Sequence, residues 1–166
     1  AMIAEQRKEY EKAHELFSDG LEYRRERMQY DDIAHSYLHL ANLSLVSNNF
    51  SQVSMYCDSA EKIIEKLFDT PIEQFGALED NKNRYLGSSK QIQAELNFKL
   101  GNKKRMNGFL EQAKIYYKKL PIELTGLLEI SAEMHFNLND LGIAIGEINE
   151  GLVLADKHGL SRQKEQ

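Results

Sequence analysis

Three short stretches decide the fold of this chain: LVSNNF at residues 45–50, FKLGNK at residues 98–103 and FNLNDL at residues 136–141. Each has the pattern of a helix end, a tight turn and a helix start, because asparagine and glycine tolerate the left-handed backbone that a helix end requires. The same small and apolar positions follow each turn. They are Val53, Cys57 and Ala60, then Met106, Leu110 and Ala113, then Ala144, Ile148 and Gly151. This recurrence predicts an array of helical hairpins.

The composition indicates a soluble, all-α protein. Of the 166 residues, 42% are hydrophobic and 28% are charged, which is ordinary for a globular chain and unlike a disordered one. Two prolines and no tryptophan, against abundant helix formers, favour helix throughout. We therefore expect an α-α superhelix of antiparallel hairpins.

Charge and cysteine content narrow the possible partners and location. The net charge of -5 argues against a nucleic-acid surface, which needs a basic face to neutralise phosphates. The longest apolar runs fall far short of the ~20 residues that cross a bilayer, so no membrane is expected. A single cysteine fits a reducing compartment, and we expect a cytoplasmic protein.

The pattern along the chain predicts one domain. We expect residues 1–2 to be a cloning remnant, residues 3–160 to form a single helical-repeat domain, and residues 161–166 to form a polar tail. Within the domain, an unpaired helix over 3–28 precedes hairpins at about 33–68, 84–120 and 122–158. Residues 72–86 are less regular, and this surplus either extends the next helix, which we favour, or forms a short helix. The unpaired first helix suggests that the chain is a fragment of a larger protein.

The hairpins resemble tetratricopeptide repeats, whose period is 34 residues in the common form and nearer 40 in several families. The positions that carry the resemblance are Tyr37, Leu40, Ala41, Phe50, Val53, Cys57 and Ala60, then Ala94, Leu100, Gly101, Asn102, Met106, Leu110 and Ala113, then Leu128, Ala132, Leu138, Asp140, Ala144, Ile148 and Gly151. The repeats are degenerate, since Ser44 and Asn97 stand where the family has tyrosine. The alternative is a generic helical bundle.

The resemblance implies a peptide-binding groove, because in this family the first helices of the hairpins line a concave face. Asn42 is notable, since an asparagine there can hold a peptide backbone by donor and acceptor; a solvated helix residue is the alternative. Carried over residue by residue, the groove positions are His35, Leu38, Asn42 and Leu45, then Ser88, Gln91, Glu95 and Phe98, then Gly126, Glu129, Glu133 and Phe136.

Charge patterning suggests what such a groove would hold. Residues 99–119 carry a net charge of +6 and residues 120–156 a net charge of -7. Because Glu95, Glu129 and Glu133 fall on groove positions, we expect a protein or peptide partner with Lys or Arg beside an apolar anchor. The alternative is that the two runs attract neighbouring hairpins to each other.

The sequence gives no support for catalysis, a cofactor or a metal site. His35 and His39 have the spacing of a metal-binding pair, but no third ligand has a defined spacing. Cys57 falls on the buried line of its helix and is predicted to be a core residue rather than a nucleophile. We therefore predict a binding protein and not an enzyme.

Three functions remain open from the sequence. The first is an interaction scaffold that acts through the concave groove. The second is a sensory repeat domain of a larger bacterial transcription regulator or sensor kinase. The third is a homo-oligomeric platform, in which the N-terminal end exposes apolar surface through Tyr10, Phe17 and Leu21 and supports a homodimer.

Overall fold

A computed structural model describes residues 2–26, 30–68 and 76–160 of the chain. These residues form seven α-helices and no strand, which confirms the all-α prediction. The proposed remnant residue Ala1 and the polar tail 161–166 lie outside the described residues, as does most of the irregular segment after the first hairpin. The helices are α1 (Met2–Glu26), α2 (Tyr30–Val46), α3 (Phe50–Phe68), α4 (Gly76–Lys99), α5 (Lys103–Tyr117), α6 (Pro121–Asn137) and α7 (Leu141–Lys157).

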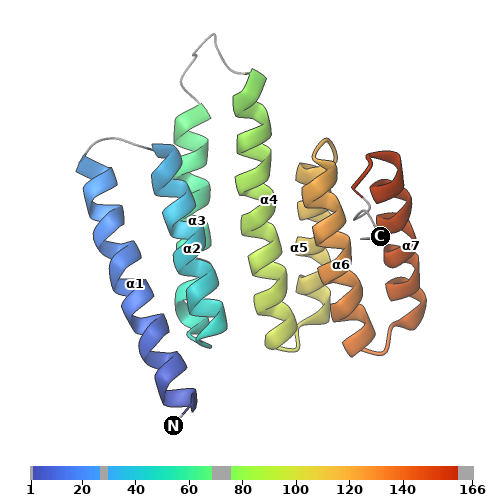
Figure 1. Ribbon diagram of the computed structural model, residues 1–166, viewed down its shortest axis with the longest axis horizontal. Coiled ribbons are helices and arrows are strands. Elements are labelled where there is room, and N and C mark those ends of the chain that lie inside the picture. Colours follow the sequence, from blue (N-terminus) through green and yellow to red (C-terminus); the bar gives the residue numbers. More distant parts are fainter. Residues whose placement is uncertain (1, 27–29, 69–75, 161–166) are drawn as a thin grey trace, which may run out of the picture.

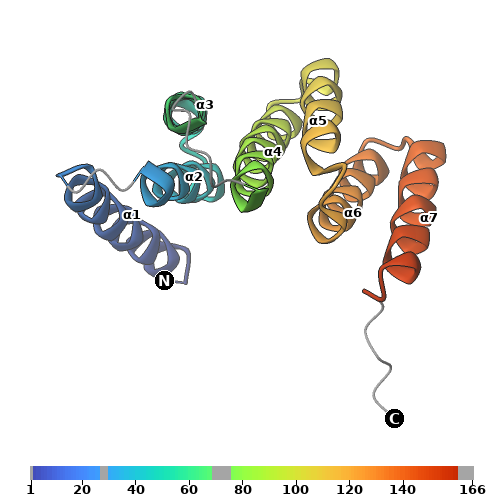
Figure 2. The ribbon, with the colours of Figure 1, turned by 90° about the horizontal axis from the view of Figure 1, so that it is seen from above.

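The helices stand side by side in a row and alternate in direction (Figure 1). Seen from above, α2, α4 and α6 form one layer, while α3 and α5 lie behind them in a second (Figure 2). The two ends of the row, α1 and α7, turn toward the same side. This curvature gives the molecule a concave face formed by the first helix of each hairpin.

The three predicted turns are confirmed by their backbone geometry. Asn48, Gly101 and Asn139 have φ angles of 61°, 71° and 61°, the left-handed conformation expected at a helix C-terminus. At each turn, the next N–H reaches back five residues to a carbonyl: Asn49 to Ser44 at 2.7 Å, Asn102 to Asn97 at 2.8 Å, and Asp140 to His135 at 2.8 Å. The same hydrogen-bonded cap therefore reverses the chain three times.

The extra residues between the first and second hairpins lengthen α4. This helix begins at Gly76, so the surplus between the first two hairpins extends it by several turns, as we favoured. The repeated positions after each turn are buried, and Ile148 in α7 is the exception. The core is thus built from equivalent positions of successive hairpins.

The expectation that Tyr10, Phe17 and Leu21 expose an apolar surface at the N-terminal end was wrong. Leu21 is buried, Tyr10 is partly buried, and the Phe17 ring stacks on His39 of α2 with centroids 4.8 Å apart. The reason is that α1 packs against α2 and covers its own apolar stripe. Large exposed hydrophobic side chains gather instead on α7, at the opposite end of the array.

Candidate functional site

The concave face brings together the predicted groove residues of α2 and α4. His35, Leu38 and Asn42 from α2 line one pocket with Ser88 and Gln91 from α4, and the pocket volume is about 220 Å³. Asn42 and His35 are exposed, so their polar groups face this pocket rather than the core. Residues 53 positions apart in the sequence therefore share one small recess.

The histidine pair of α2 lies at the edge of this recess. The Nε2 atoms of His35 and His39 are 3.1 Å apart, so one ring donates a hydrogen bond to the other. His39 is also stacked on Phe17, and the His35 ring lies 6.0 Å from the Tyr85 ring. Among the described residues, no group of three or more His, Cys, Asp or Glu side chains is arranged to hold a metal ion.

The assignment of Leu45 to the groove was wrong. Leu45 is buried in a core cluster that includes Leu21 and Phe17 of α1 and Phe50 of α3. Leu45 occupies the same repeat position as Phe98 and Phe136. Because α1 packs against α2, this position is part of the core in the first hairpin. Leu38 belongs to the same cluster and reaches the recess only with its remaining surface.

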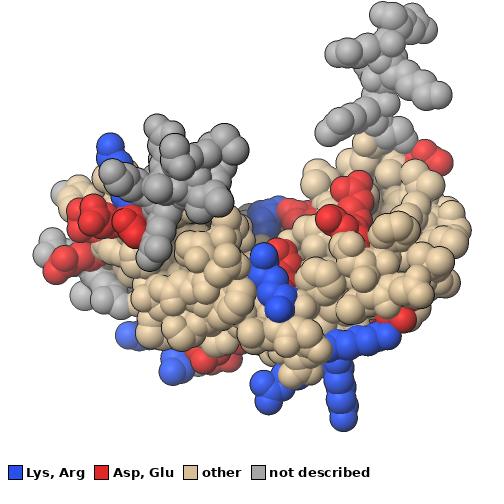
Figure 3. Space-filling model, turned by 90° about the horizontal axis from the view of Figure 1, so that it is seen from below, with Lys and Arg blue, Asp and Glu red and all other residues tan. Residues whose placement is uncertain are grey.

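The acidic positions of α4 and α6 lie close together. Glu95 accepts a hydrogen bond from Gln91 Nε2 at 3.1 Å. Burial raises the pKa of Glu95, and the nearby carboxylate of Glu133 acts in the same direction, while Gln91 and Lys99 act against it. Figure 3 shows acidic side chains on the wall of the hollow toward the α5–α7 end of the row, with lysine or arginine side chains beside them in the hollow and others along the opposite edge.

Part of the charge pattern joins neighbouring hairpins, as the alternative interpretation expected. The carboxylates of Glu123, Asp140 and Glu147 pair with cations of the preceding hairpin. The pairs are Arg84 Nε to Glu123 Oε1 at 2.6 Å, Lys103 Nζ to Asp140 Oδ2 at 2.6 Å and Lys114 Nζ to Glu147 Oε1 at 3.2 Å. Glu95, Glu129 and Glu133 form no ion pair with any residue in the described ranges. The groove acids therefore do not take part in the ion pairs between hairpins.

Two phenylalanines accompany these acids. Phe98 is partly buried against the core of the second and third hairpins, whereas Phe136 is 64% exposed. The two residues occupy equivalent positions, one helical turn from Glu95 and Glu133 respectively. Glu133 and Phe136 therefore place a carboxylate and an accessible aromatic ring on adjacent turns of α6.

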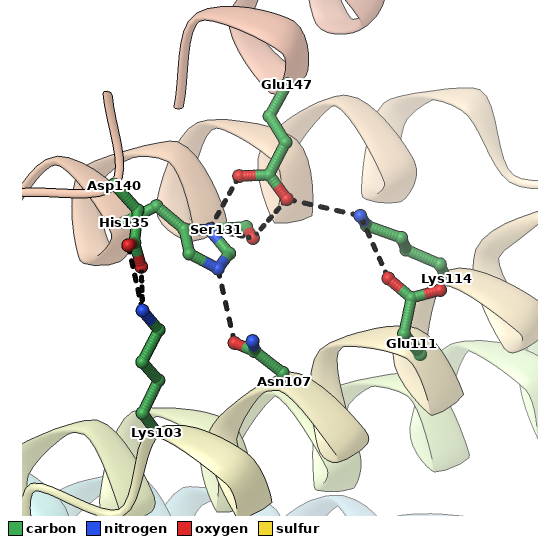
Figure 4. A network of polar contacts seen from close by, with 8 residues as sticks. All are labelled: Lys103, Asn107, Glu111, Lys114, Ser131, His135, Asp140 and Glu147. Atoms are coloured by element: carbon green, nitrogen blue, oxygen red, sulfur yellow. Dashed lines mark hydrogen bonds and ion pairs between the residues drawn. The ribbon is translucent and has the colours of Figure 1, made fainter. Parts of the chain in front are cut away.

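The structure also contains a buried polar network that the sequence analysis missed (Figure 4). Glu147 of α7 accepts hydrogen bonds from Ser131 Oγ at 2.6 Å and from His135 Nδ1 at 2.9 Å, both on α6. The other ring nitrogen of His135 lies 3.2 Å from Asn107 Oδ1 of α5. Glu147 lies between Ala144 and Gly151 on the buried line of α7, and a charged residue on that line is the signal that could have revealed the network.

This network does not have the geometry of a nucleophilic site. Ser131 donates to the carboxylate and not to the imidazole, and its side chain is fully buried. A substrate carbonyl therefore has no access to the hydroxyl. We infer that Ser131, His135 and Glu147 serve to fix α7 against α6, with Lys114 and Asn107 extending the contact to α5.

Cys57 is a core residue, as the sequence predicted. Its side chain is fully buried, its Sγ donates weakly to the Ser89 carbonyl at 3.8 Å, and burial raises its pKa to about 12. A thiol with this pKa holds almost no thiolate at neutral pH. The described structure therefore gives Cys57 a packing role between α3 and α4.

Replacing Glu95 with glutamine is expected to stabilise the fold at neutral pH. Because the Glu95 pKa is raised in the folded state, that state binds more protons than the unfolded chain between the ordinary and the raised pKa. The free energy of unfolding therefore falls as pH rises through this window, and Glu95→Gln removes that fall. Urea unfolding at a series of pH values measures it, with exposed Glu129→Gln as the control; a less stable Glu95→Gln protein would contradict the prediction.

Comparison with protein-family models, with curated proteins and with solved structures found no match for this chain. None of the helices in the described ranges has the length and apolarity that a membrane span needs.

Proposed function

We propose that the chain is a binding module that holds a protein or peptide segment against the concave face of α2, α4 and α6. The observation that supports this proposal is that Glu95 is partly buried, lies near Glu133 and forms no ion pair within the described ranges. A lysine or arginine of the ligand would offset the cost of burying the Glu95 charge and its repulsion by Glu133. The site thus favours a basic group.

The apolar part of the ligand is expected beside the acids. Phe136 is 64% exposed one turn from the exposed Glu133, and aromatic side chains are enriched among the residues that anchor protein interfaces. The recess lined by Asn42, His35 and Gln91 lies further along the same face and supplies polar groups for a ligand backbone. A ligand segment with Lys or Arg next to an aliphatic or aromatic residue could therefore contact the acids and Phe136 together.

The resemblance to tetratricopeptide repeats also supports the concave face as the binding surface. In that family the first helices of the hairpins bind extended peptides, and the first helices here line the concave side (Figure 2). Preformed helices present such a groove without the entropy cost of ordering a loop. The proposal is therefore recognition by a scaffold rather than a reaction.

Panning a random peptide display library on the immobilised chain tests the proposal. We expect enriched peptides that carry Lys or Arg next to an apolar residue. The double variant Glu95→Lys/Glu133→Lys is expected to bind a selected peptide at least about tenfold more weakly, because two like charges then face the ligand cation. The affinity of the unmodified protein should fall with salt, and that of the variant should depend on salt much less.

The matched control is a double variant with the same change of charge at residues outside the concave face. Glu111→Lys/Glu150→Lys alters two exposed acids on α5 and α7 by the same net charge. We expect this variant to bind the selected peptide with nearly unchanged affinity. Equal affinity of all three proteins, or enrichment of peptides without basic residues, would exclude the proposed site.

A further inference from the structure

One side of α7 carries an aliphatic stripe that nothing in the described structure covers. Leu141, Ile145, Ile148 and Leu152 are all exposed. At 100° per residue, the four lie within about 60° of one another around the helix axis, and they extend along about 17 Å of it. The other exposed aliphatic residues of α7, Ile143 and Val153, fall outside this sector. Because α7 is the last helix of the row (Figure 1), these four residues form an apolar face at the end of the array.

The internal repeat shows that the middle of this face is covered in the two earlier hairpins. Cys57 and Leu110 occupy the position of Ile148 in the two earlier hairpins, and both are buried, whereas Ile148 is 52% exposed. The neighbouring position holds Glu61 in α3 and Lys114 in α5. Both of these side chains bond to the helices that follow: Glu61 to Ser89, Lys90 and Gln93, and Lys114 to Glu147.

The corresponding position of α7 is Leu152, which has no polar group to offer. Where α3 and α5 use a charged side chain to hold the next hairpin, α7 is purely aliphatic along the whole stripe. A partner helix therefore has to meet it with an apolar surface of its own. A polar or charged peptide would leave its own groups unsatisfied there.

The stripe is self-complementary. Its members are spaced by four, three and four residues and read Leu, Ile, Ile, Leu, so both the spacing and the residue types are the same in either direction. If two α7 helices pack antiparallel about a two-fold axis, Leu141 faces Leu152 of the second copy and Ile145 faces Ile148. Isologous pairing of this kind is the commonest arrangement in homodimers.

The charge distribution is compatible with such a pair. Each copy carries a net charge of -5, which opposes self-association in general. The stripe itself contains no ionisable side chain, so two copies can meet there without placing like charges opposite one another. We propose that the Leu141, Ile145, Ile148 and Leu152 face of α7 is the interface of a homodimer in which two α7 helices pack antiparallel.

Sedimentation velocity over a range from low micromolar to near-millimolar protein tests this interface. We expect a monomer–dimer equilibrium that Ile145→Glu and Ile148→Glu each shift toward monomer by at least about tenfold in dissociation constant, since each buries two new charges per dimer. The matched control is Val153→Glu, which adds the same charge to α7 at a residue that is 69% exposed and lies off the stripe. It should dimerise nearly as the unmodified protein does.

Far-UV circular dichroism establishes that each variant is folded, and a cross-link tests the orientation. Antiparallel packing predicts that Leu141→Cys and Leu152→Cys chains, when mixed, form disulfide-linked pairs faster than either variant alone. Cys57 is buried and gives little background. A strict monomer at all concentrations, equal dimerisation of the Ile145→Glu and Val153→Glu proteins, or faster cross-linking of like variants would overturn the proposal.

Discussion

Replacing Glu147 with alanine is expected to lower the free energy of unfolding by about 3 kcal/mol, because it removes the shared acceptor of a buried network. Ser131 and His135 would each lose a hydrogen bond inside the core, and Lys114 would lose a partner on α7. Since repeat arrays are stabilised by nearest-neighbour interfaces, the loss should fall first on α7. Urea unfolding followed by far-UV circular dichroism measures the total change.

Two companion variants make this prediction specific. Glu150→Ala removes an exposed carboxylate from the same helix and should change stability by less than about 0.5 kcal/mol. Glu147→Gln keeps hydrogen-bonding capacity but not the charge, and its effect should lie between the two. Amide hydrogen exchange should show reduced protection in α7 of the Glu147→Ala protein before any other helix. If Glu147→Ala were no less stable than Glu150→Ala, the network would not fix α7.

The second large effect is expected from Gly87→Ala, which should destabilise the protein by about 2 kcal/mol despite the better helix propensity of alanine. A Cβ atom at Gly87 would lie 2.2 Å from Cε1 of Tyr117 and 2.6 Å from Cδ1 and Cζ. The Tyr117 ring is almost fully buried, and its hydroxyl lies 3.0 Å from Ser88 Oγ, so it cannot move without loss. Thermal and urea unfolding measure the change.

Size compensation between hairpins explains why glycine stands at this place. One hairpin earlier, 53 residues back in each case, the equivalent pair is Ala34 and Ile64, which share a core cluster. The larger Tyr117 requires the smaller Gly87. Gly108→Ala is the control, because a Cβ there meets no atom within 4 Å, and it should stabilise the protein by up to about 1 kcal/mol. The same sign of change in both variants would contradict this reading of the α4–α5 contact.

The sequence predicted the helices and turns well, because these depend on local chemistry. Asn48, Gly101 and Asn139 adopt the left-handed conformation for which their residue types are suited, and α3 ends at Phe68, where the first hairpin was expected to end. The surplus before the second hairpin could not be placed with the same certainty from the pattern alone. Its residues have no strong helical periodicity, and in such segments tertiary packing determines whether a helix forms.

The candidate site was predicted less completely, because it depends on how helices cover one another. Leu45 was assigned to the groove by its equivalence to Phe98 and Phe136, but it lies in a core cluster to which α1 contributes Leu21 and Phe17. The Glu147 network was missed because its members come from three helices, and no spacing along one helix reveals them. The polar recess of α2 and α4, in contrast, follows the repeat register and was anticipated by it.

Binding at the concave face is tested most directly by titrating an isotope-labelled chain with a synthetic peptide that carries two arginines next to a leucine, and following its backbone amide resonances. We expect shifts concentrated in the turns of α4 and α6 that carry Glu95, Phe98, Glu133 and Phe136, and expect them to vanish for the Glu95→Lys/Glu133→Lys variant. Shifts confined to α3 and α5 on the opposite side, or an identical pattern in the variant, would contradict concave-face recognition.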